Sequence, residues 1–205
     1  FSASTLGLQW QWNHNPDDRR WSLRERSGFL RLHATQADRL WTARNTLTQK
    51  GQGPRSRAIV KVDMRGLRPG DVCGVGTFGK ISAQLSIVGS DKGRRALTMM
   101  ATDSTEDGPR TETRVASVPV SGQTLWLRTD MDFISDEGRV AYSRDGQSWT
   151  GVGDHFPLKF DWRTGTFQGQ QFALSCYNAR PDGGYIDIDS FTLSPLPEAV
   201  EEARP

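Results

Sequence analysis

The chain has little cysteine, and it lacks any hydrophobic run long enough to cross a bilayer. Its two cysteines, Cys73 and Cys176, are too few and too far apart in the sequence to indicate a disulfide framework. Both stand in apolar, strand-like contexts, where a free cysteine behaves as a small buried hydrophobe. We therefore expect both to be buried, with their pairing left open, and we expect no membrane partner.

The chain also lacks a concentration of charge of one sign, because 26 Lys and Arg residues are spread among 24 Asp and Glu residues. The net charge of +2 produces no basic field of the kind that attracts phosphate groups. Pairs such as Arg19-Arg20 and Arg94-Arg95 indicate solvated surface. We therefore expect no nucleic-acid partner.

No segment shows a sustained helical period. Instead, 21 glycines and 10 prolines separate many short runs in which hydrophobic and polar residues alternate. This pattern predicts an all-β sandwich or barrel, and a chain of 205 residues suits one such domain. We expect the sandwich to span residues 1–194. Residues 195–205 are rich in proline and acidic residues, which indicates a disordered tail or a linker remnant.

The alternating runs predict where the strands lie. They cover residues 9–12, 29–33, 40–49, 58–64, 71–78, 81–88, 96–100, 111–120, 124–133, 140–143, 172–177 and 185–191. Gly74 and Gly76 indicate a bulge, the close approach of a backbone or ligand, or a tightly packed strand. Asp145-Gly146 predicts a hairpin with a primed turn, in which both central residues have positive φ.

Residues 9–32 contain three of the seven tryptophans, beside an Asn-His-Asn triplet. Alternation places Trp10 and Trp12 on one face of a first strand, and Leu30 and Leu32 on one face of a second. Residues 13–18 favour a turn between the two strands. We therefore expect a hairpin built around a polar loop.

Sugar binding requires flat aromatic faces for the C–H side of pyranose rings, and planar polar side chains for the hydroxyl groups. The opening stretch and the run that follows it supply both kinds. The candidate carbohydrate-binding residues are Trp10, Trp12, Asn13, His14, Asn15, Arg31, Arg44, Asn45 and Gln49, together with Tyr177 and Asn178. Tryptophans in a sandwich are more often core than ligand platform, so we expect Trp126, Trp149 and Trp162 in the core.

Several motifs occur in an order that resembles a known family. They are Trp-Gln-Trp-Asn-His-Asn-Pro at 10–16, Gly-Asp-Val-Cys-Gly-Val at 70–75, Tyr-Ser-Arg-Asp-Gly-Gln-Ser-Trp at 142–149 and Gly-Gly-Tyr-Ile-Asp-Ile-Asp-Ser-Phe at 183–191. The chain resembles the C-terminal concanavalin A-like module of glycoside hydrolase family 43 enzymes, mostly β-xylosidases and α-arabinofuranosidases, and is similar to carbohydrate-binding module family 91. It departs from that pattern at Cys73, where alanine is typical, and at Ser190, where an aromatic residue is common.

The resemblance implies a jelly-roll sandwich of two antiparallel sheets, and it places the family 43 active site in a separate five-bladed propeller. It implies that this module binds xylan or a related plant cell-wall polysaccharide. The alternative is a structural module that packs on the catalytic domain of the parent glycosidase and shapes its active site. Because the chain starts at Phe1 without an initiator methionine, we expect an excised piece of a longer protein, and the missing targeting segment says nothing about the parent's location. We expect the parent to be secreted or periplasmic.

A stand-alone lyase or hydrolase on the same fold is a third hypothesis. A glycosidase requires two carboxyl groups a few ångströms apart, and the Glu-x-Asp-x-(x)-Glu strand signature of catalytic members does not occur. Asp187 and Asp189 share a predicted strand face, but Tyr185 and Phe191 fall on that face too, which indicates a structural role. A Gly-x-Ser-x-Gly elbow is also missing, so we expect no catalysis by this chain.

Zinc-ligand spacing is absent from the sequence. Jelly-roll carbohydrate modules often hold a structural calcium, for which the candidate ligands are Asp17, Asp18, Asp187 and Asp189. Ordinary turn and surface roles are the alternative, because no calcium-loop motif surrounds them. We expect no cofactor, with a structural calcium left open.

Overall fold

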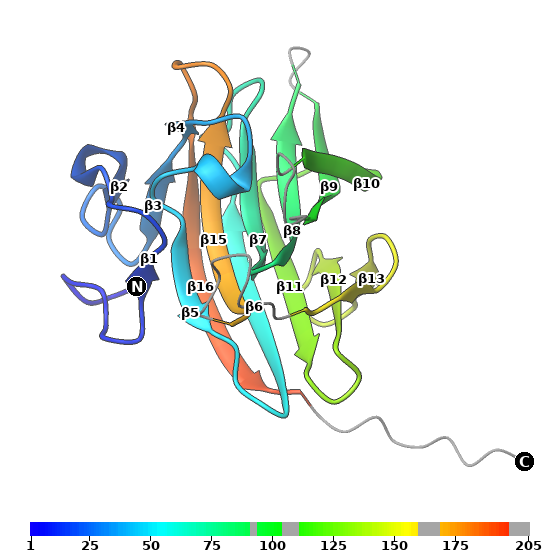
Figure 1. The fold of residues 1–205 in the computed structure, drawn as a ribbon. Helices are drawn as coiled ribbons and strands as arrows, with labels where there is room; N and C mark the ends of the chain where they lie inside the picture. The colour runs from blue at the N-terminus through cyan, green and yellow to red at the C-terminus, as the bar shows by residue number, and fades with distance from the viewer. Residues whose placement is uncertain (91–93, 104–110, 160–168, 197–205) are drawn as a thin grey trace, which may run out of the picture.

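The computed structural model describes residues 1–90, 94–103, 111–159 and 169–196, and its two sheets pack face to face (Figure 1). The predicted all-β sandwich of two antiparallel sheets is therefore confirmed. The helical elements of these residues include two 3-10 turns, η1 (Asp18–Arg20) and η2 (Leu40–Thr42). None of the described helices is long and apolar enough to span a membrane.

We name the two sheets A and B. Sheet A consists, in spatial order, of β1 (Gln11–Trp12), β5 (Leu47–Lys50), β15 (Gln171–Asn178), β7 (Val72–Phe78), β8 (Ile81–Gly89), β9 (Arg95–Asp103) and β10 (Thr111–Val120), with β4 (Thr35–Gln36) parallel to β15. Sheet B consists of β13 (Thr150–Gly151), β12 (Glu137–Ser143), β11 (Thr124–Asp132), β6 (Arg55–Asp63), β16 (Tyr185–Pro195), β3 (Leu30–His33) and β2 (Trp21–Ser22), with β14 (Phe156–Pro157) beside β12.

The core lies between the sheets, because alternate residues of each strand point inward. On β11, Leu125 and Leu127 are fully buried in this core, whereas Trp126 is only half-buried. On β3, Leu30 and Leu32 are buried while the residues after each of them are not. The predicted inward and outward faces of these strands are confirmed.

The two glycines of β7 allow the backbone of β8 to approach closely. A Cβ atom at Gly74 would collide with the carbonyl oxygen of Leu85, and one at Gly76 would collide with that of Ala83. Of the readings that the sequence left open, the structure selects the close approach of another backbone.

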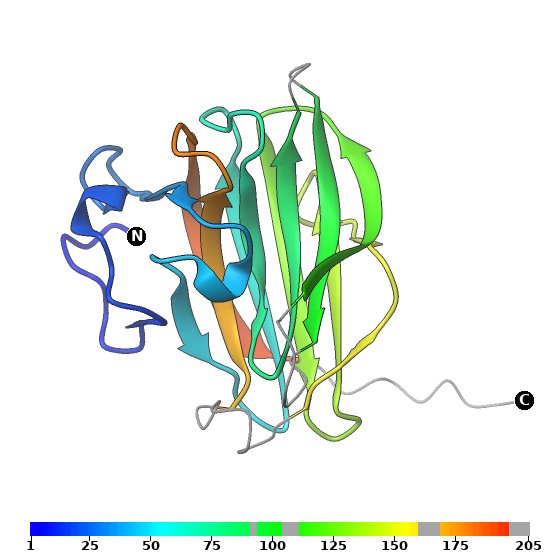
Figure 2. The same cartoon turned by 45° about the horizontal axis from the view of Figure 1, so that its top comes forward.

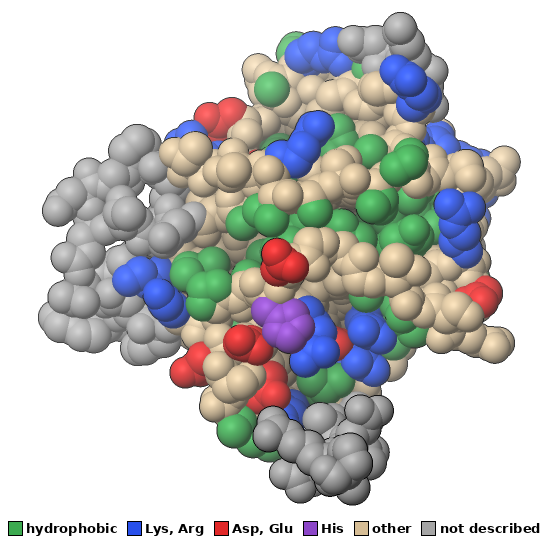
Figure 3. Space-filling model, turned by 90° about the vertical axis from the view of Figure 1, so that its right-hand side faces the viewer, with side chains coloured by type: hydrophobic (Ala, Val, Ile, Leu, Met, Phe, Trp, Pro, Cys, Tyr) green, Lys and Arg blue, Asp and Glu red, His purple; other side chains and the backbone are tan. Residues whose placement is uncertain are grey.

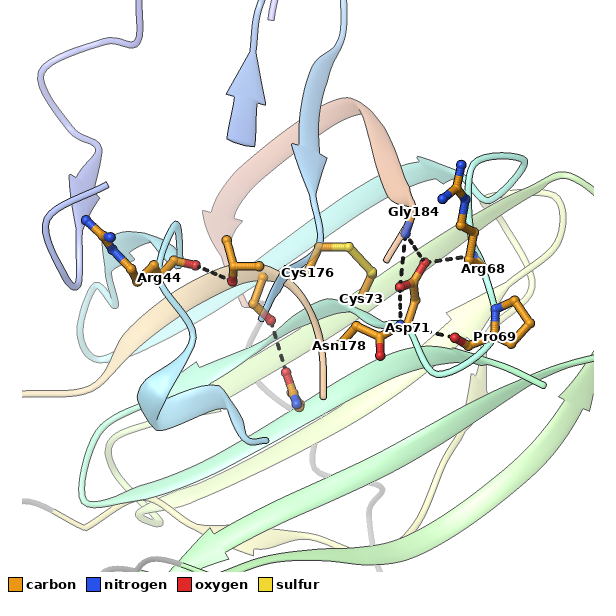
Figure 4. The surroundings of a disulfide bond; sticks show 11 residues. Arg44, Arg68, Pro69, Asp71, Cys73, Cys176, Asn178 and Gly184 are labelled. Atoms are coloured by element: carbon orange, nitrogen blue, oxygen red, sulfur yellow. Dashed lines mark hydrogen bonds between the residues drawn. A yellow bond between two sulfur atoms is a disulfide. The ribbon is translucent and has the colours of Figure 1, made fainter. Parts of the chain in front are cut away.

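Cys73 and Cys176 form a disulfide (Figure 4). They lie directly opposite each other on β7 and β15, with their Cα atoms 4.0 Å apart, and both are buried. The expected burial of both cysteines is confirmed, and the pairing that the sequence left open is settled by the structure. Their separation of 103 residues carries no information about which strands become neighbours in the sheet.

The opening stretch does not form the predicted hairpin. β1 pairs with β5 in sheet A, where Trp12 lies opposite Leu47, whereas β3 pairs with β16 in sheet B, where Leu32 lies opposite Ile186. The polar segment between them therefore crosses from one sheet to the other. Alternation fixes which side of a strand is buried, but it does not identify the partner strand.

The predicted hairpin at Asp145-Gly146 is present, because β12 pairs with β13 across it. The predicted turn type was wrong. Gly146 has a φ of 77°, but Asp145 does not have positive φ, and the loop spans residues 144–149. The carboxylate of Asp145 accepts the backbone N–H groups of Gln147 and Ser148, both at 2.8 Å, which closes this longer loop and lowers the pKa of Asp145.

Trp126 and Trp149 do not belong to the core, contrary to the prediction. Both are half-buried, with Lys61 Nζ 5.3 Å from the Trp126 ring and the Arg128 guanidinium 4.9 Å from the Trp149 ring. These cation–π contacts cover the indoles on the outer face of sheet B. Trp162 lies outside the described residues.

The sequence predicted one strand face shared by Tyr185, Asp187, Asp189 and Phe191. This prediction was wrong for Phe191. The register of β16 shifts between Ile188 and Ser190, so Phe191 lies opposite the buried Val60 of β6. Phe191 therefore packs against the core. A β-bulge inserts one residue and reverses the alternation beyond it.

Two segment boundaries also differ from the sequence expectation. The predicted strand at 40–49 divides into η2 and β5, so only its second half is extended. β16 ends at Pro195, and the next backbone N–H, of Leu196, donates to Arg55 O at 3.2 Å. The rest of the predicted tail, 197–205, lies outside the described residues.

Candidate functional site

Much of the outer face of sheet A, the face opposite the core, is closed by side chains. Gln84, Ser86 and Thr98 point to this face because Leu85 and Leu97 point into the core, yet none of the three polar residues is more than 2% exposed. The segment containing η2 lies in front of β15 in two views of the molecule (Figures 1 and 2). A ligand site on sheet A must therefore lie beside this closed region.

A hydrogen-bonded group of side chains closes the face. The Tyr177 hydroxyl donates to Glu112 Oε2 at 2.6 Å, and Gln84 Nε2 donates to Glu112 Oε1 at 3.1 Å. The Leu40 N–H also donates to Glu112 Oε1, at 3.5 Å, which joins η2 to β10. Burial raises the pKa values of both Glu112 and Tyr177. Tyr177, a candidate sugar ligand from the sequence, is therefore part of the interior.

Asn178 is buried as well, near the disulfide (Figure 4). Its Nδ2 donates to Asp71 Oδ1 at 2.8 Å and to Pro69 O at 3.1 Å. Asp71, which is fully buried, also accepts the backbone N–H groups of Arg68 at 2.7 Å and Gly184 at 3.0 Å. Asn178 therefore ties two loops together and has no exposed surface for a ligand.

One open cavity, of about 440 Å³, lies beside η2. Its lining residues are His14, Asn15, Trp41, Thr42 and Arg44. The Trp41 ring stacks on Phe78 with centroids 4.9 Å apart and planes inclined by 7°. Phe78 therefore supports one face of the indole, and Trp41 lines the cavity. We call this the Trp41 cavity.

Hydrogen bonds from the lining residues hold two loops around the Trp41 cavity. His14 Nε2 lies 2.7 Å from Trp41 O, and Arg44 donates from Nε and Nη2 to Asn15 O at 3.0 and 2.9 Å. Arg44 Nη1 and His14 Nδ1 have no hydrogen-bond partner within the described part of the chain. These two nitrogens can therefore bind ligand hydroxyl groups.

Asn45 positions the same loops from below the surface. It is 2% exposed and has a φ of 57°. Its side-chain oxygen accepts the Asp17 N–H at 2.8 Å, and its Nδ2 donates to Asp17 O at 2.8 Å. Asn13 contributes a backbone bond, from its N–H to Thr46 O at 3.0 Å. Asn45 therefore supports the site without facing a ligand.

Trp10 and Gln49 line a different cavity, of about 590 Å³, together with Phe191 and residues of the N-terminal segment. The Trp10 ring contacts the Phe191 ring edge-on at 4.8 Å. Trp12 packs on Trp21, with ring centroids 5.2 Å apart, and against the core. The structure thus brings His14, Asn15 and Arg44 together but separates them from Trp10 and Trp12.

Arg31 lies on sheet B, away from these cavities. Its Nε and Nη2 donate to the two oxygens of Asp187 at 2.7 and 2.9 Å, and its guanidinium stacks 3.7 Å from the Tyr185 ring centroid. The bond with Asp187 raises the pKa of Arg31. Arg31 is therefore committed to an ion pair within the protein.

The four aspartates considered for calcium each bind another side chain. Asp17 bonds Arg19, which lowers its pKa to about 2, and Asp18 accepts the Trp21 indole N–H at 3.0 Å. The other two are in ion pairs, Asp187 with Arg31 and Asp189 with Lys61. Over the described ranges, no three metal-ligating side chains come together.

Trp41 and Thr42 are the cavity residues that the sequence did not single out. The available signal was the position of Trp41, three residues before Arg44. The alternating pair Trp10 and Trp12 is a stronger sequence pattern than the single Trp41. The tertiary structure selects Trp41 because η2 places it beside an open cavity, whereas Trp10 and Trp12 pack against neighbouring rings.

Comparison with known proteins identifies the domain. Residues 1–194 match the family model described as the β-xylosidase C-terminal concanavalin A-like domain. The chain is 30% identical to a β-xylosidase of Formosa agariphila over 94% of its own length and 34% of that protein. It is 31% identical to a putative β-xylosidase of Xylanibacter ruminicola, over 77% of this chain and 27% of that protein. The chain thus spans about a third of the length of these curated relatives.

Solved structures agree with this assignment. A bifunctional GH43-CE protein of Bacteroides eggerthii superimposes with a TM-score of 0.85 at 32% identity, over 93% of this chain and 24% of that one. A GH43 enzyme engineered for endo-xylanase and exo-arabinofuranosidase activity superimposes with a TM-score of 0.88 at 28% identity, over 96% and 40%. The resemblance drawn from the motifs is confirmed: the chain belongs to the family of C-terminal concanavalin A-like domains of glycoside hydrolase family 43 β-xylosidases.

Proposed function

We propose that this domain is a non-catalytic module that binds xylan or xylo-oligosaccharides and is attached to a xylan-degrading glycosidase. The observation that carries the proposal is the Trp41 ring, which Phe78 holds rigid at 4.9 Å while it lines an open cavity. A fixed indole face packs well against the C–H side of a pyranose ring. Arg44 and His14 supply hydrogen-bond donors beside it.

Two further observations support a binding role over a catalytic one. Asp187 and Asp189, the paired acids of the sequence, bind Arg31 and Lys61 at 2.7 and 2.6 Å. Glu112 is enclosed by Tyr177 and does not line the Trp41 cavity. A carboxylate that is already neutralised by a protein cation is poorly placed to act as the acid or nucleophile of glycoside hydrolysis. The relatives named as β-xylosidases suggest xylan as the polymer.

Titration calorimetry with xylohexaose, and native electrophoresis in gels containing xylan, test this proposal. We expect Trp41→Ala to weaken binding by about 1–3 kcal/mol, the range for a nucleic-acid base stacked on an aromatic side chain, which we take as a guide for a pyranose ring. Trp149→Ala is the matched control, because it removes a half-buried indole from sheet B. The proposal fails if the wild-type domain shows no retardation, or if both variants bind as the wild type does.

The second candidate function is a structural module that braces a catalytic domain. The cavity of about 590 Å³ beside Trp10 favours it, because Phe1, Leu6 and Phe191 line this cavity and bring apolar surface to the N-terminal side of the module. The relatives, about three times as long as this chain, have room for such a domain. A mobility that is unchanged by xylan in the gel, combined with loss of thermal stability of the longer enzyme on Trp10→Ala, would favour the brace.

We also propose that the parent protein is exported to an oxidising compartment, secreted or periplasmic. The Cys73–Cys176 disulfide supports this location, because such bonds persist outside the reducing cytosol. Thiol alkylation of the protein in extracts, before and after reduction, tests it. Two thiols that react without reduction would contradict the proposal.

A further inference from the structure

A third cavity, of about 320 Å³, lies on the outer face of sheet A where β8 passes into β9. It shares no lining residue with the Trp41 cavity. Two of its lining residues, Arg94 and Arg114, come from segments that are distant in the sequence. We call it the Arg94–Arg114 cavity.

The floor of this cavity is an apolar strip. Val88, Ala96 and Pro119 lie side by side on β8, β9 and β10, because Ala96 is the register partner of both of the others. They face outward, since the adjacent Ile87 and Leu97 are fully buried in the core. A flat apolar strip of this kind suits the C–H face of a sugar ring.

A β-bulge directs Arg114 to the same face. Arg114 lies opposite Met100 and Ala116 lies opposite Met99, so two steps along β10 correspond to one step along β9. Ala116 packs against the core, and in a regular strand Arg114, two residues earlier, would point to the core as well. Val115 is the extra residue of the bulge, so Arg114 points outward instead. Bulges are a common means of re-aiming a side chain at a binding site.

Arg94, Arg95 and Arg114 all line this cavity. The Arg95 guanidinium donates to Gly122 O at 3.2 Å, whereas the side chains of Arg94 and Arg114 have no ion-pair or hydrogen-bond partner among the residues that the structure describes. The hydroxyl oxygen of Ser90, which also lines the cavity, is buried and lacks a partner over the same ranges. On the face shown in Figure 3, several Lys and Arg side chains lie along the upper edge away from acidic groups, whereas those beside the histidine lower down lie among Asp and Glu side chains.

We propose that the Arg94–Arg114 cavity binds a carboxylate-bearing sugar residue, such as a uronic acid side group of a plant polysaccharide. The guanidinium group forms paired hydrogen bonds with a carboxylate, and the apolar strip accepts the ring that carries it. The cavity volume of about 320 Å³ suits one sugar residue. The choice of polymer rests on the proposed function, whereas the sugar acid is recognised by the cavity alone.

Titration of the domain with D-glucuronate, D-glucose and inorganic phosphate tests this site. We expect glucuronate to bind and glucose, its neutral counterpart, to bind at least about tenfold more weakly, as expected for loss of a charge-assisted hydrogen bond. Arg114→Gln and Arg94→Gln should each weaken glucuronate binding by a similar factor. Arg24→Gln is the matched control, because the exposed side chain of Arg24 has no partner in the described chain and does not line the cavity.

Two outcomes would overturn the assignment. Phosphate binding as tight as glucuronate would identify a general anion site, and glucuronate binding that survives both arginine substitutions would place the ligand elsewhere. Xylohexaose binding, measured on the same variants, separates this inference from the proposed function. Xylohexaose binding should be unchanged by Arg114→Gln and weakened by Trp41→Ala, so failure of the glucuronate experiment alone leaves xylan binding standing.

Discussion

The outer faces of the two sheets use the same residue types in opposite ways. On sheet B, arginines and aspartates of adjacent strands are paired with each other, as in Arg31–Asp187 at 2.7 Å and Arg57–Asp130 at 2.7 Å. On the outer face of sheet A, the carboxylate of Glu112 is enclosed by neutral hydrogen-bond donors. The cations Arg44 and Arg114 line separate open cavities on that side.

This difference indicates which face can bind a ligand. A guanidinium that is already bound to a carboxylate has its donors occupied, and pulling it away leaves a partly buried charge uncompensated. The indoles of sheet B are likewise covered by Lys61 and Arg128. On the side of sheet A, Trp41 and Arg44 line an open cavity, and Arg44 Nη1 has no hydrogen-bond partner among the described residues. Abundance of aromatic and basic residues is therefore a weaker guide to a site than whether they are already paired.

The largest expected effect on the free energy of unfolding comes from breaking an ion pair on sheet B. The side chain of Asp187 is only 4% exposed, and its carboxylate binds both Arg26 and Arg31. Asp187→Ala leaves these two arginines without their shared carboxylate. We expect the free energy of unfolding to fall by about 3–5 kcal/mol, as for other broken buried pairs. Urea unfolding followed by tryptophan fluorescence measures it.

Glu25→Gln is the control for that substitution. Glu25 also pairs with Arg31, at 3.2 Å, but its side chain is 43% exposed. A surface pair contributes at most about 1 kcal/mol. Equal losses for the two variants would show that burial does not distinguish the pairs on this face.

A somewhat smaller effect is expected when the disulfide of sheet A is removed. Reduction, or the double substitution Cys73→Ala with Cys176→Ala, releases a closed loop of about 100 residues in the unfolded chain. We expect a loss of about 2–4 kcal/mol, measured as a lower thermal midpoint in reductant. The double variant serves as the control, because reductant should not change its midpoint. A wild-type midpoint that reductant leaves unchanged would contradict a stabilising bond.

The smallest expected effect on the free energy of unfolding comes from Glu112, in the closed region of the outer face of sheet A. Burial raises the pKa of Glu112 above its ordinary value of 4.5, so the folded state holds this proton more tightly than the unfolded state. The resulting stabilisation is present below pH 4.5 and is lost as the pH rises through the raised pKa. Glu112→Gln should therefore remove a decline in unfolding free energy between pH 4.5 and neutrality, measured by urea unfolding across that range.

Asp63 provides an internal check on that pH series. Bonds from Arg65 and Arg26 lower its pKa to about 2, against the opposing effect of burial. The contribution of Asp63 to the free energy of unfolding is therefore complete above pH 3.8, the ordinary pKa of an aspartate, and is lost as the pH falls toward 2. The decrease in unfolding free energy below pH 3.8 should therefore be the same in the wild type and in Glu112→Gln. If the two proteins differed only below pH 3.8, the decline between pH 4.5 and neutrality could not be assigned to Glu112.

Prediction of the site from the sequence was partial for identifiable reasons. The segment 13–15 and Arg44 were selected because planar polar residues stood together, and His14, Asn15 and Arg44 do line one cavity. Trp41 was not selected, because nothing local shows that Phe78, from a distant strand, supports its ring. Tyr177 was selected from its neighbours in the sequence, whereas its partner Glu112 comes from a strand 65 positions away.

The sequence by itself determined the strands, their buried faces and the family, because alternation with a period of two and the order of motifs are properties of the chain alone. Only the tertiary structure decided that Cys73 meets Cys176 and that β1 and β3 lie in different sheets. It also decided that bulges reverse the facing of Phe191 and Arg114. Strand partners and register are set by contacts between segments far apart in the sequence, which a local pattern does not contain.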